Sequence, residues 1–207
     1  SYGMIDLPEG KMKSREGTVV DADDIISKVE KLAFEEVNKR YPSLSKEKKE
    51  YRAKIIGMAA LKFYILKFSA IKGFTFNPKE SISFEGETGP YILYCNARIN
   101  SIISKSGRDI DLNVKWELLK HQAELLLLKH LTYFPEIINS AENSYNIHII
   151  PQYLLSLCQS FNSFYSSCLV ISEDKELEKV RLLLIKCVQV VIKIGLNILG
   201  IEILDQM

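Results

Sequence analysis

The segment from Leu182 to Leu204 constrains the fold of this chain more than any other feature, because it is almost apolar and long enough to cross a membrane. Its polar residues recur at steps of three or four positions and are Lys186, Gln189, Lys193 and Asn197. That spacing places them in one stripe along a helix, with apolar side chains over the remaining surface. The segment is therefore predicted to be an amphipathic helix buried in a protein core, and no membrane partner is expected.

Helical periodicity recurs along most of the chain, and an apolar content of 47% can supply a substantial core. A segment rich in glycine and proline, Phe74 to Gly89, interrupts the periodicity and is expected to link two domains, residues 1–84 and 85–207. We expect an all-α fold, in which a short strand within Tyr2–Leu7 and two helices precede a helical bundle. The predicted helices cover residues 21–41, 45–66, 91–104, 114–131, 135–142, 149–168 and 175–201.

Charge and cysteine spacing limit the possible partners. The formal net charge is only +1, so no global field attracts nucleic acid, and any RNA contact must come from a local patch. The cysteines form no CxxC pair and have no histidine at zinc-ligand spacing. We therefore expect buried free thiols, no metal site and a reduced, cytoplasmic protein. The cysteines are Cys95, Cys158, Cys168 and Cys187.

A loop bounded by Gly10 and Gly17 carries residues suited to phosphate binding. Glycines at both ends permit unusual backbone angles, and lysine side chains provide compact cationic donors for phosphate oxygens. On this chemistry alone, a solvated charged loop without a ligand is the commoner interpretation. The candidate phosphate contacts are Lys11, Lys13, Ser14 and Arg15.

The order of residues in this loop resembles a known signature. The run Lys11–Arg15 is similar to the KMSKS motif of class I aminoacyl-tRNA synthetases, and its continuation to Asp24 resembles the version found in arginyl-tRNA synthetases. The resemblance implies that residues 1–84 are the end of a catalytic region, whose loop closes over ATP and stabilises the pyrophosphate end of the transition state. Ser14 stands where the general motif has its second lysine, so the cation that replaces that lysine is left open.

Three residues of the predicted helix 91–104 share one face. Tyr91, Tyr94 and Arg98 follow one another at steps of three and four, which aligns two aromatic rings with one guanidinium. Proteins bind unpaired RNA bases with this combination, by stacking on tyrosine or arginine planes and by hydrogen bonds to base edges. The alternative is that the tyrosines pack in a core and that Arg98 forms a structural ion pair.

The surrounding segments resemble the DALR anticodon-binding domain of arginyl-tRNA synthetases, which is a helical bundle. Residues 76–102 are similar to the start of that domain, and residues 151–165 and 195–207 are similar to its later parts. The resemblance implies that side chains from all three segments hold the anticodon loop, with the last methionine against a base. By this resemblance the tRNA contacts are Tyr91, Tyr94, Arg98, Tyr165 and Met207.

The chain departs from the family pattern in two places. The Asp-Ala-Leu-Arg motif is reduced to an acid and an arginine, Glu178 and Arg181, and the resemblance assigns no role to either. Leu169 stands where some relatives have a larger aromatic side chain, so one stacking surface is missing or is supplied by Met207. Tyr153 is interpreted as a core residue.

The resemblance implies a piece of a larger enzyme. The chain begins at Ser1 directly in a predicted strand, so we expect the C-terminal part of an arginyl-tRNA synthetase, which uses ATP with magnesium to join arginine to its tRNA. The expected partners are arginine tRNA, with ATP and arginine for the full-length enzyme, which is expected to be a monomer. The isolated chain is expected to be inactive and to hold no cofactor tightly. The alternatives are a standalone helical RNA-binding or interaction module with a vestigial loop, and a purely structural helical protein.

Overall fold

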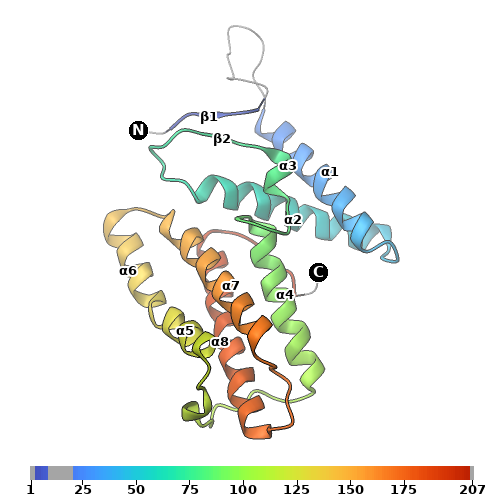
Figure 1. Ribbon diagram of the computed structural model, residues 1–207. Helices are drawn as coiled ribbons and strands as arrows, with labels where there is room; N and C mark the ends of the chain where they lie inside the picture. The colour runs from blue at the N-terminus through green and yellow to red at the C-terminus, as the bar shows by residue number, and fades with distance from the viewer. Residues whose placement is uncertain (1–2, 9–20, 206–207) are drawn as a thin grey trace.

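The computed structural model describes residues 3–8 and 21–205, and it has two layers (Figure 1). The upper layer in that view holds a small sheet with α1 (Ala22–Arg40) and α2 (Lys46–Leu66), and a helical bundle lies below it. This architecture confirms the predicted all-α class. The phosphate-loop residues, Lys11 to Arg15, and the terminal Met207 lie outside the described residues. The bundle consists of α4 (Gly89–Ser106), α5 (Gln122–Thr132), α6 (Phe134–Ser144), α7 (Ile149–Ser167) and α8 (Lys175–Ile198).

The sheet joins the beginning of the chain to the segment after α2. Strand β1 (Ile5–Asp6) pairs in parallel with β2 (Phe74–Thr75), with Ile5 opposite Phe74. The predicted strand is thus shorter than expected in its described part. Its partner was not predicted, because two residues inside a glycine- and proline-rich segment carry no alternating pattern. A single helical turn, α3 (Pro78–Ser81), then leads toward the bundle.

Side chains fix the turn between α1 and α2. The Ser45 hydroxyl caps α2 by accepting a hydrogen bond from the Lys48 backbone N–H at 3.4 Å. The buried Lys49 ammonium donates to the Asn38 side-chain oxygen at 2.9 Å and to the Pro42 carbonyl at 2.8 Å. These bonds satisfy the buried cation and hold the two helices as a hairpin.

The start of α4 lies directly against α2. The Thr88 hydroxyl accepts from the Tyr91 backbone N–H at 3.2 Å, which caps the helix, and Gly107 ends it with a φ of 61°. A Cβ on Gly89 would lie 2.4 Å from the Ala59 carbonyl oxygen of α2, so only glycine permits this approach. The candidate site on α4 is therefore fixed relative to the upper layer.

The predicted helix 114–131 is wrong in its first half. A short 3-10 turn, Trp116–Leu118, is followed by an extended break, and α5 begins only at Gln122. The break arises because His121 and Glu124 form a capping box, in which the Glu124 carboxylate accepts from the Lys120 and His121 backbone N–H groups at 2.9 and 2.8 Å. Glutamate three residues after a cap is a start signal that the apolar periodicity obscured.

Helix α8 follows the predicted polar stripe only in part. Asn197 is exposed as expected, but Gln189 is 1% exposed and donates a hydrogen bond to the Asn100 side chain of α4. Apolar side chains also reach solvent, because Val190, Ile194 and Ile198 are each more than 40% exposed. Among the described residues, no helix combines the length and apolar character needed to cross a membrane.

One hydrophobic cluster connects both layers. It contains Ala33 of α1 and Phe63 of α2 together with Ile92 of α4, Leu154 of α7 and Leu184 of α8, each fully buried. The core thus runs through the proposed boundary between residues 84 and 85, and the division into two domains there stays a prediction. A smaller cluster lies beneath the sheet.

The segment after α8 returns along α4 and is held by side chains. The Asn96 side-chain amide donates to the Leu204 carbonyl at 2.9 Å, and the Asn100 amide donates to the Asp205 carbonyl at 2.9 Å. Gly200, with a φ of 64°, makes the turn, and its carbonyl accepts from the Lys62 ammonium of α2. The segment therefore forms a fixed wall beside α4.

Candidate nucleic-acid interface

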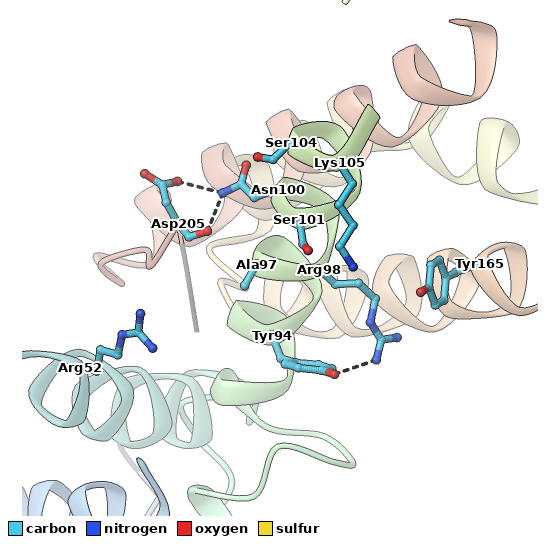
Figure 2. Close-up of a pocket in the computed structure, with 10 residues that line it drawn as sticks. All are labelled: Arg52, Tyr94, Ala97, Arg98, Asn100, Ser101, Ser104, Lys105, Tyr165 and Asp205. Carbon is cyan, nitrogen blue, oxygen red and sulfur yellow. Dashed lines mark hydrogen bonds between the residues drawn. The ribbon is translucent and has the colours of Figure 1, made fainter. Parts of the chain in front are cut away.

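A groove of about 910 Å³ lies along α4, between α7, α2 and the segment after α8 (Figure 2). Its walls come from four separate parts of the chain, so only the folded protein forms it. Polar and charged side chains dominate the lining. The lining residues are Arg52, Tyr94, Ala97, Arg98, Asn100, Ser101, Ser104, Lys105, Tyr165 and Asp205.

Arg98 is held at the centre of the groove by neutral partners. Its Nη1 donates to the Asn162 side-chain oxygen at 2.9 Å, and its Nη2 donates to the Tyr94 hydroxyl at 3.0 Å. The guanidinium carbon lies 4.7 Å from the centre of the Tyr94 ring and 5.1 Å from that of Tyr165. Two cation–π contacts and two hydrogen bonds thus orient the guanidinium without neutralising its charge.

Tyr91 belongs to the same network although it does not line the groove. Its hydroxyl oxygen accepts a hydrogen bond from the Asn162 side-chain amide at 2.7 Å. Burial raises the pKa of Tyr91 to about 12, and the hydrogen bond from Asn162 offsets only part of that rise. The hydroxyl therefore keeps its proton at neutral pH and serves as a neutral support for Asn162.

Tyr165 presents the aromatic surface that is most open to solvent in this network. It lies on α7, is 44% exposed, and stacks on Phe161 with 6.1 Å between ring centres and 29° between planes. A ring supported on one side by another ring can offer its remaining surface to a planar ligand. The structure thus brings together Tyr91, Tyr94, Arg98 and Tyr165, whereas Met207 lies outside the described residues.

Asn162 and seven of the lining residues were not identified from the sequence. Asn162 connects α4 to α7, and its position three residues before Tyr165 on the same helical face was an available signal. Lys105 follows Arg98 on α4, whereas Arg52 and Asp205 come from two other segments, and no local pattern in the sequence connects these to α4. They meet only because α2 and the segment after α8 pack on α4.

The two remaining DALR-motif residues lie away from the groove and have structural contacts. Glu178, with a side chain 2% exposed, pairs with Arg108 at 2.8 Å and accepts from the Ser172 backbone N–H at 2.9 Å. Burial would raise the pKa of Glu178, but the hydrogen bonds and nearby cations lower it below its usual value. These contacts fasten the start of α8 to the loops before it.

Arg181, one turn later in α8, also fastens the start of this helix to neighbouring segments. Its Nε pairs with the buried Glu124 carboxylate at 2.7 Å, and its Nη1 donates to the Leu169 carbonyl at 2.7 Å. The Leu169 side chain itself is 78% exposed, so it provides no aromatic surface and no core packing. Tyr153 is 7% exposed and stacks on Phe134, as expected of a core residue.

Other chemistries find less support in the described residues. The thiols of Cys95, Cys158 and Cys168 are free and buried, whereas Cys187 is half-buried rather than buried as expected. Within residues 3–8 and 21–205, no group of three histidine, cysteine or carboxylate side chains could hold a metal ion. The groove offers aromatic faces, a guanidinium plane and hydrogen-bond donors, which suit the binding of bases and phosphates.

The sequence profile of the DALR anticodon binding domain matches residues 92–207, which include α4 through α8 and the segment after α8. The chain belongs to the DALR anticodon-binding domain family. Among its relatives, the arginine–tRNA ligase of Flavobacterium psychrophilum is 41% identical over 210 residues, and that of Phocaeicola vulgatus is 42% identical over 214 residues. Each alignment covers 100% of this chain and 35% of the relative.

The fold of this DALR-family chain matches a solved structure over its whole length. The arginyl-tRNA synthetase of Thermus thermophilus superposes with a TM-score of 0.89 at 28% identity, covering 100% of this chain and 35% of that protein. The resemblance to arginyl-tRNA synthetases drawn from the sequence is thereby confirmed. The chain spans about a third of the length of the relatives that it matches.

Proposed function

We propose that this chain is the C-terminal part of an arginine–tRNA ligase and that the groove along α4 binds the anticodon loop of arginine tRNA. The observation that carries the proposal is the arrangement around Arg98, whose guanidinium contacts the Tyr94 and Tyr165 rings and, among the described residues, is held by neutral groups. Its relatives bear the name arginine–tRNA ligase and align with the entire chain.

The groove would read RNA by stacking and by hydrogen bonds. An unpaired base stacks on the exposed Tyr165 ring, and the free N–H groups of Arg98 and the Tyr94 hydroxyl contact base edges. Tyr91 acts through Asn162 by holding Arg98 in place. Met207, which lies outside the described residues, is proposed to supply an apolar surface against a base.

The remaining part of the proposal concerns catalysis by the full-length protein. Lys11, Lys13, Ser14 and Arg15 would contact the phosphates of ATP, which binds with magnesium while arginine is activated. The full-length enzyme is proposed to act as a cytoplasmic monomer, and the 207-residue chain alone is proposed to be inactive. In the full-length enzyme, Lys11→Ala should slow ATP–pyrophosphate exchange more than it weakens tRNA binding, and unchanged exchange would remove Lys11 from the site.

The anticodon proposal can be tested with the chain itself. Fluorescence anisotropy would measure its affinity for the anticodon stem-loop of an arginine tRNA and for the same stem-loop with an unrelated anticodon. Arg98→Ala should weaken binding to the arginine stem-loop by about 5-fold to 160-fold, because base stacking and the hydrogen bonds of one residue contribute about 1–3 kcal/mol. Discrimination between the two stem-loops should fall with it.

Lys129→Ala is a matched control, because this exposed cation lies on α5, which packs on α7 away from the groove. It should leave both affinities unchanged. Equal binding of the two stem-loops by the wild-type chain would refute anticodon recognition. Equal affinities of wild type and Arg98→Ala would refute the role of Arg98.

A further inference from the structure

Two cations that line the groove have no carboxylate partner among the described residues. The Arg52 guanidinium lies over the Tyr41 ring, at 5.4 Å from its centre, and no ion pair or hydrogen bond within residues 3–8 and 21–205 involves the Lys105 side chain. Some lysines elsewhere do pair with carboxylates, as Lys179 does with Glu176 at 2.9 Å. Unneutralised cations gathered in one groove favour a polyanionic ligand.

The shape of the groove gives these two cations separate places. Lys105 follows Arg98 by seven positions on α4, which is about 10 Å along the helix axis. Figure 2 shows its side chain running back along α4 toward Arg98, as helical geometry directs long side chains. Arg52 rises from α2, which packs at the other end of α4, where Gly89 meets Ala59.

The surface of α4 that faces the groove is built from small side chains. Ala97, Ser101 and Ser104 line it and recur at steps of four and three, so they form a shallow strip beside the cations. Small residues let a ligand backbone approach a helix closely. The strip is about 10 Å long, about three times the 3.4 Å rise of one nucleotide in a duplex strand, so an RNA strand laid along it would place more than one nucleotide in the groove.

The carboxylate that lines the groove does not cancel this charge. Asp205 accepts from the Lys193 ammonium at 3.0 Å and from the Asn100 amide at 3.2 Å, and these hydrogen bonds lower the pKa of Asp205. Its charge is thus balanced by Lys193, which does not line the groove. A chain with a formal net charge of +1 therefore concentrates positive charge along α4.

We propose that Lys105 and Arg52 bind backbone phosphates of a single RNA strand, on either side of the base held at Arg98. This proposal rests on the proposed function and extends it from base recognition to the path of the strand. Phosphate contacts set affinity and register but carry no sequence information, so these two residues should act alike on every RNA sequence. Arg98 and the tyrosines would supply the discrimination.

The test compares Arg52→Met, Lys105→Met and the control Lys129→Met, because methionine keeps an unbranched apolar stem without the charge. Affinities for the arginine stem-loop and for the unrelated stem-loop are measured by anisotropy across a salt series. Loss of one phosphate contact should reduce the slope of log K against log salt by about 0.7. Between about 50 and 200 mM salt, the ratio of wild-type to variant affinity should then shrink about 2.6-fold per variant.

Both stem-loops should be affected equally, and Lys129→Met should leave the slope unchanged. A second arm uses stem-loops with neutral methylphosphonate linkages at single positions. A neutral linkage at one position should weaken binding by the wild type but leave the affinity of Lys105→Met unchanged. A neutral linkage at a different position should weaken binding by the wild type but leave the affinity of Arg52→Met unchanged. Thermal unfolding of each variant checks that the fold is retained.

The outcomes separate this proposal from the proposed function. Unchanged salt slopes for both variants, with Arg98→Ala still impaired, would overturn the phosphate contacts and leave anticodon binding intact. A variant that loses discrimination between the stem-loops would also overturn the proposal, because it would identify a base contact. Wild-type protein that binds neither stem-loop would overturn both.

Discussion

Asn162 is the residue whose replacement tests the arrangement of the groove most directly, because it accepts a hydrogen bond from Arg98 and donates one to Tyr91. Asn162→Leu keeps a similar volume and removes both bonds, together with the weaker one to the Cys95 sulfur at 3.8 Å. A hydrogen bond to a charged group contributes about 1.5–3 kcal/mol and a neutral one about 0.5–1.5 kcal/mol. Water reaches the groove and replaces part of each, so we expect about 1–2 kcal/mol of lost stability, which lowers the unfolding midpoint by about 2–8 °C.

The effect of Asn162→Leu on RNA affinity follows from the conformational freedom that the Arg98 side chain regains when it loses the hydrogen bond to Asn162. Immobilising one such side chain on binding costs about 0.5–1.5 kcal/mol, so Asn162→Leu should bind the arginine stem-loop about 2-fold to 13-fold more weakly. In an Arg98→Ala background, Asn162→Leu should cause no further loss of affinity, because its only effect on RNA passes through Arg98. Anisotropy titrations of the four proteins in this cycle measure the coupling.

Asn143→Leu is the matched control, because Asn143 is exposed on α6 and its amide donates only to the Asn139 carbonyl of the same helix. If Asn162→Leu bound the arginine stem-loop as tightly as the wild type does, despite a lowered unfolding midpoint, then Arg98 would need no support from α7. Additive losses in the double variant would show that Asn162 contacts RNA itself. Either result would refute the reasoning.

Three further predictions concern stability. Arg181→Met leaves the buried Glu124 carboxylate without its ion-pair partner, which should cost about 3–5 kcal/mol and lower the unfolding midpoint by roughly 6–20 °C. Glu178→Gln should destabilise the chain at pH 7, and denaturant titrations should show the difference from wild type shrinking as pH falls below about 4.3. The sign follows because a carboxyl with a lowered pKa stabilises the fold above its unfolded pKa and loses that contribution as it is protonated. Gly89→Ala should cost about 1–3 kcal/mol in the same titrations, since its Cβ would meet the Ala59 carbonyl.

Each of these has a clear contrary outcome. Lys179 pairs with Glu176 on the same helix, and Lys179→Met should change stability by less than about 1 kcal/mol. If Arg181→Met destabilised the chain no more than Lys179→Met does, the stabilising role of the buried ion pair would be refuted. A constant difference between wild type and Glu178→Gln from pH 7 to pH 3 would contradict the lowered pKa. An unchanged midpoint for Gly89→Ala would contradict the contact between α4 and α2.

Local signals in the sequence predicted most helices and three residues of the network around Arg98. Tyr91, Tyr94 and Arg98 lie within two turns of one helix, so their shared face follows from spacing alone. Tyr165 was placed by resemblance, and the structure joins it to Arg98 across α4 and α7. The assignment of these residues to tRNA binding stays a prediction.

Features formed between distant segments were not accessible from the sequence. Arg52 reaches the groove only because α2 packs on α4, and Asn100 joins three segments by bonding to Gln189 and Asp205. Gln189 of α8 was assigned to the surface for the same reason, because the sequence does not show that its hydrogen-bond partner lies on another helix. Whether such a polar side chain is buried depends on its hydrogen-bond partners and not on its polarity alone.

The continuous core between the two layers has a mechanical consequence for the groove. Arg52 stands on one layer and Arg98 on the other, and the packed interior between them resists compression and shear. The width of the groove is therefore set in the free protein. If the groove binds RNA as proposed, the ordering on binding should fall chiefly on the nucleotides, which would have to unstack and splay to fit a groove of fixed width.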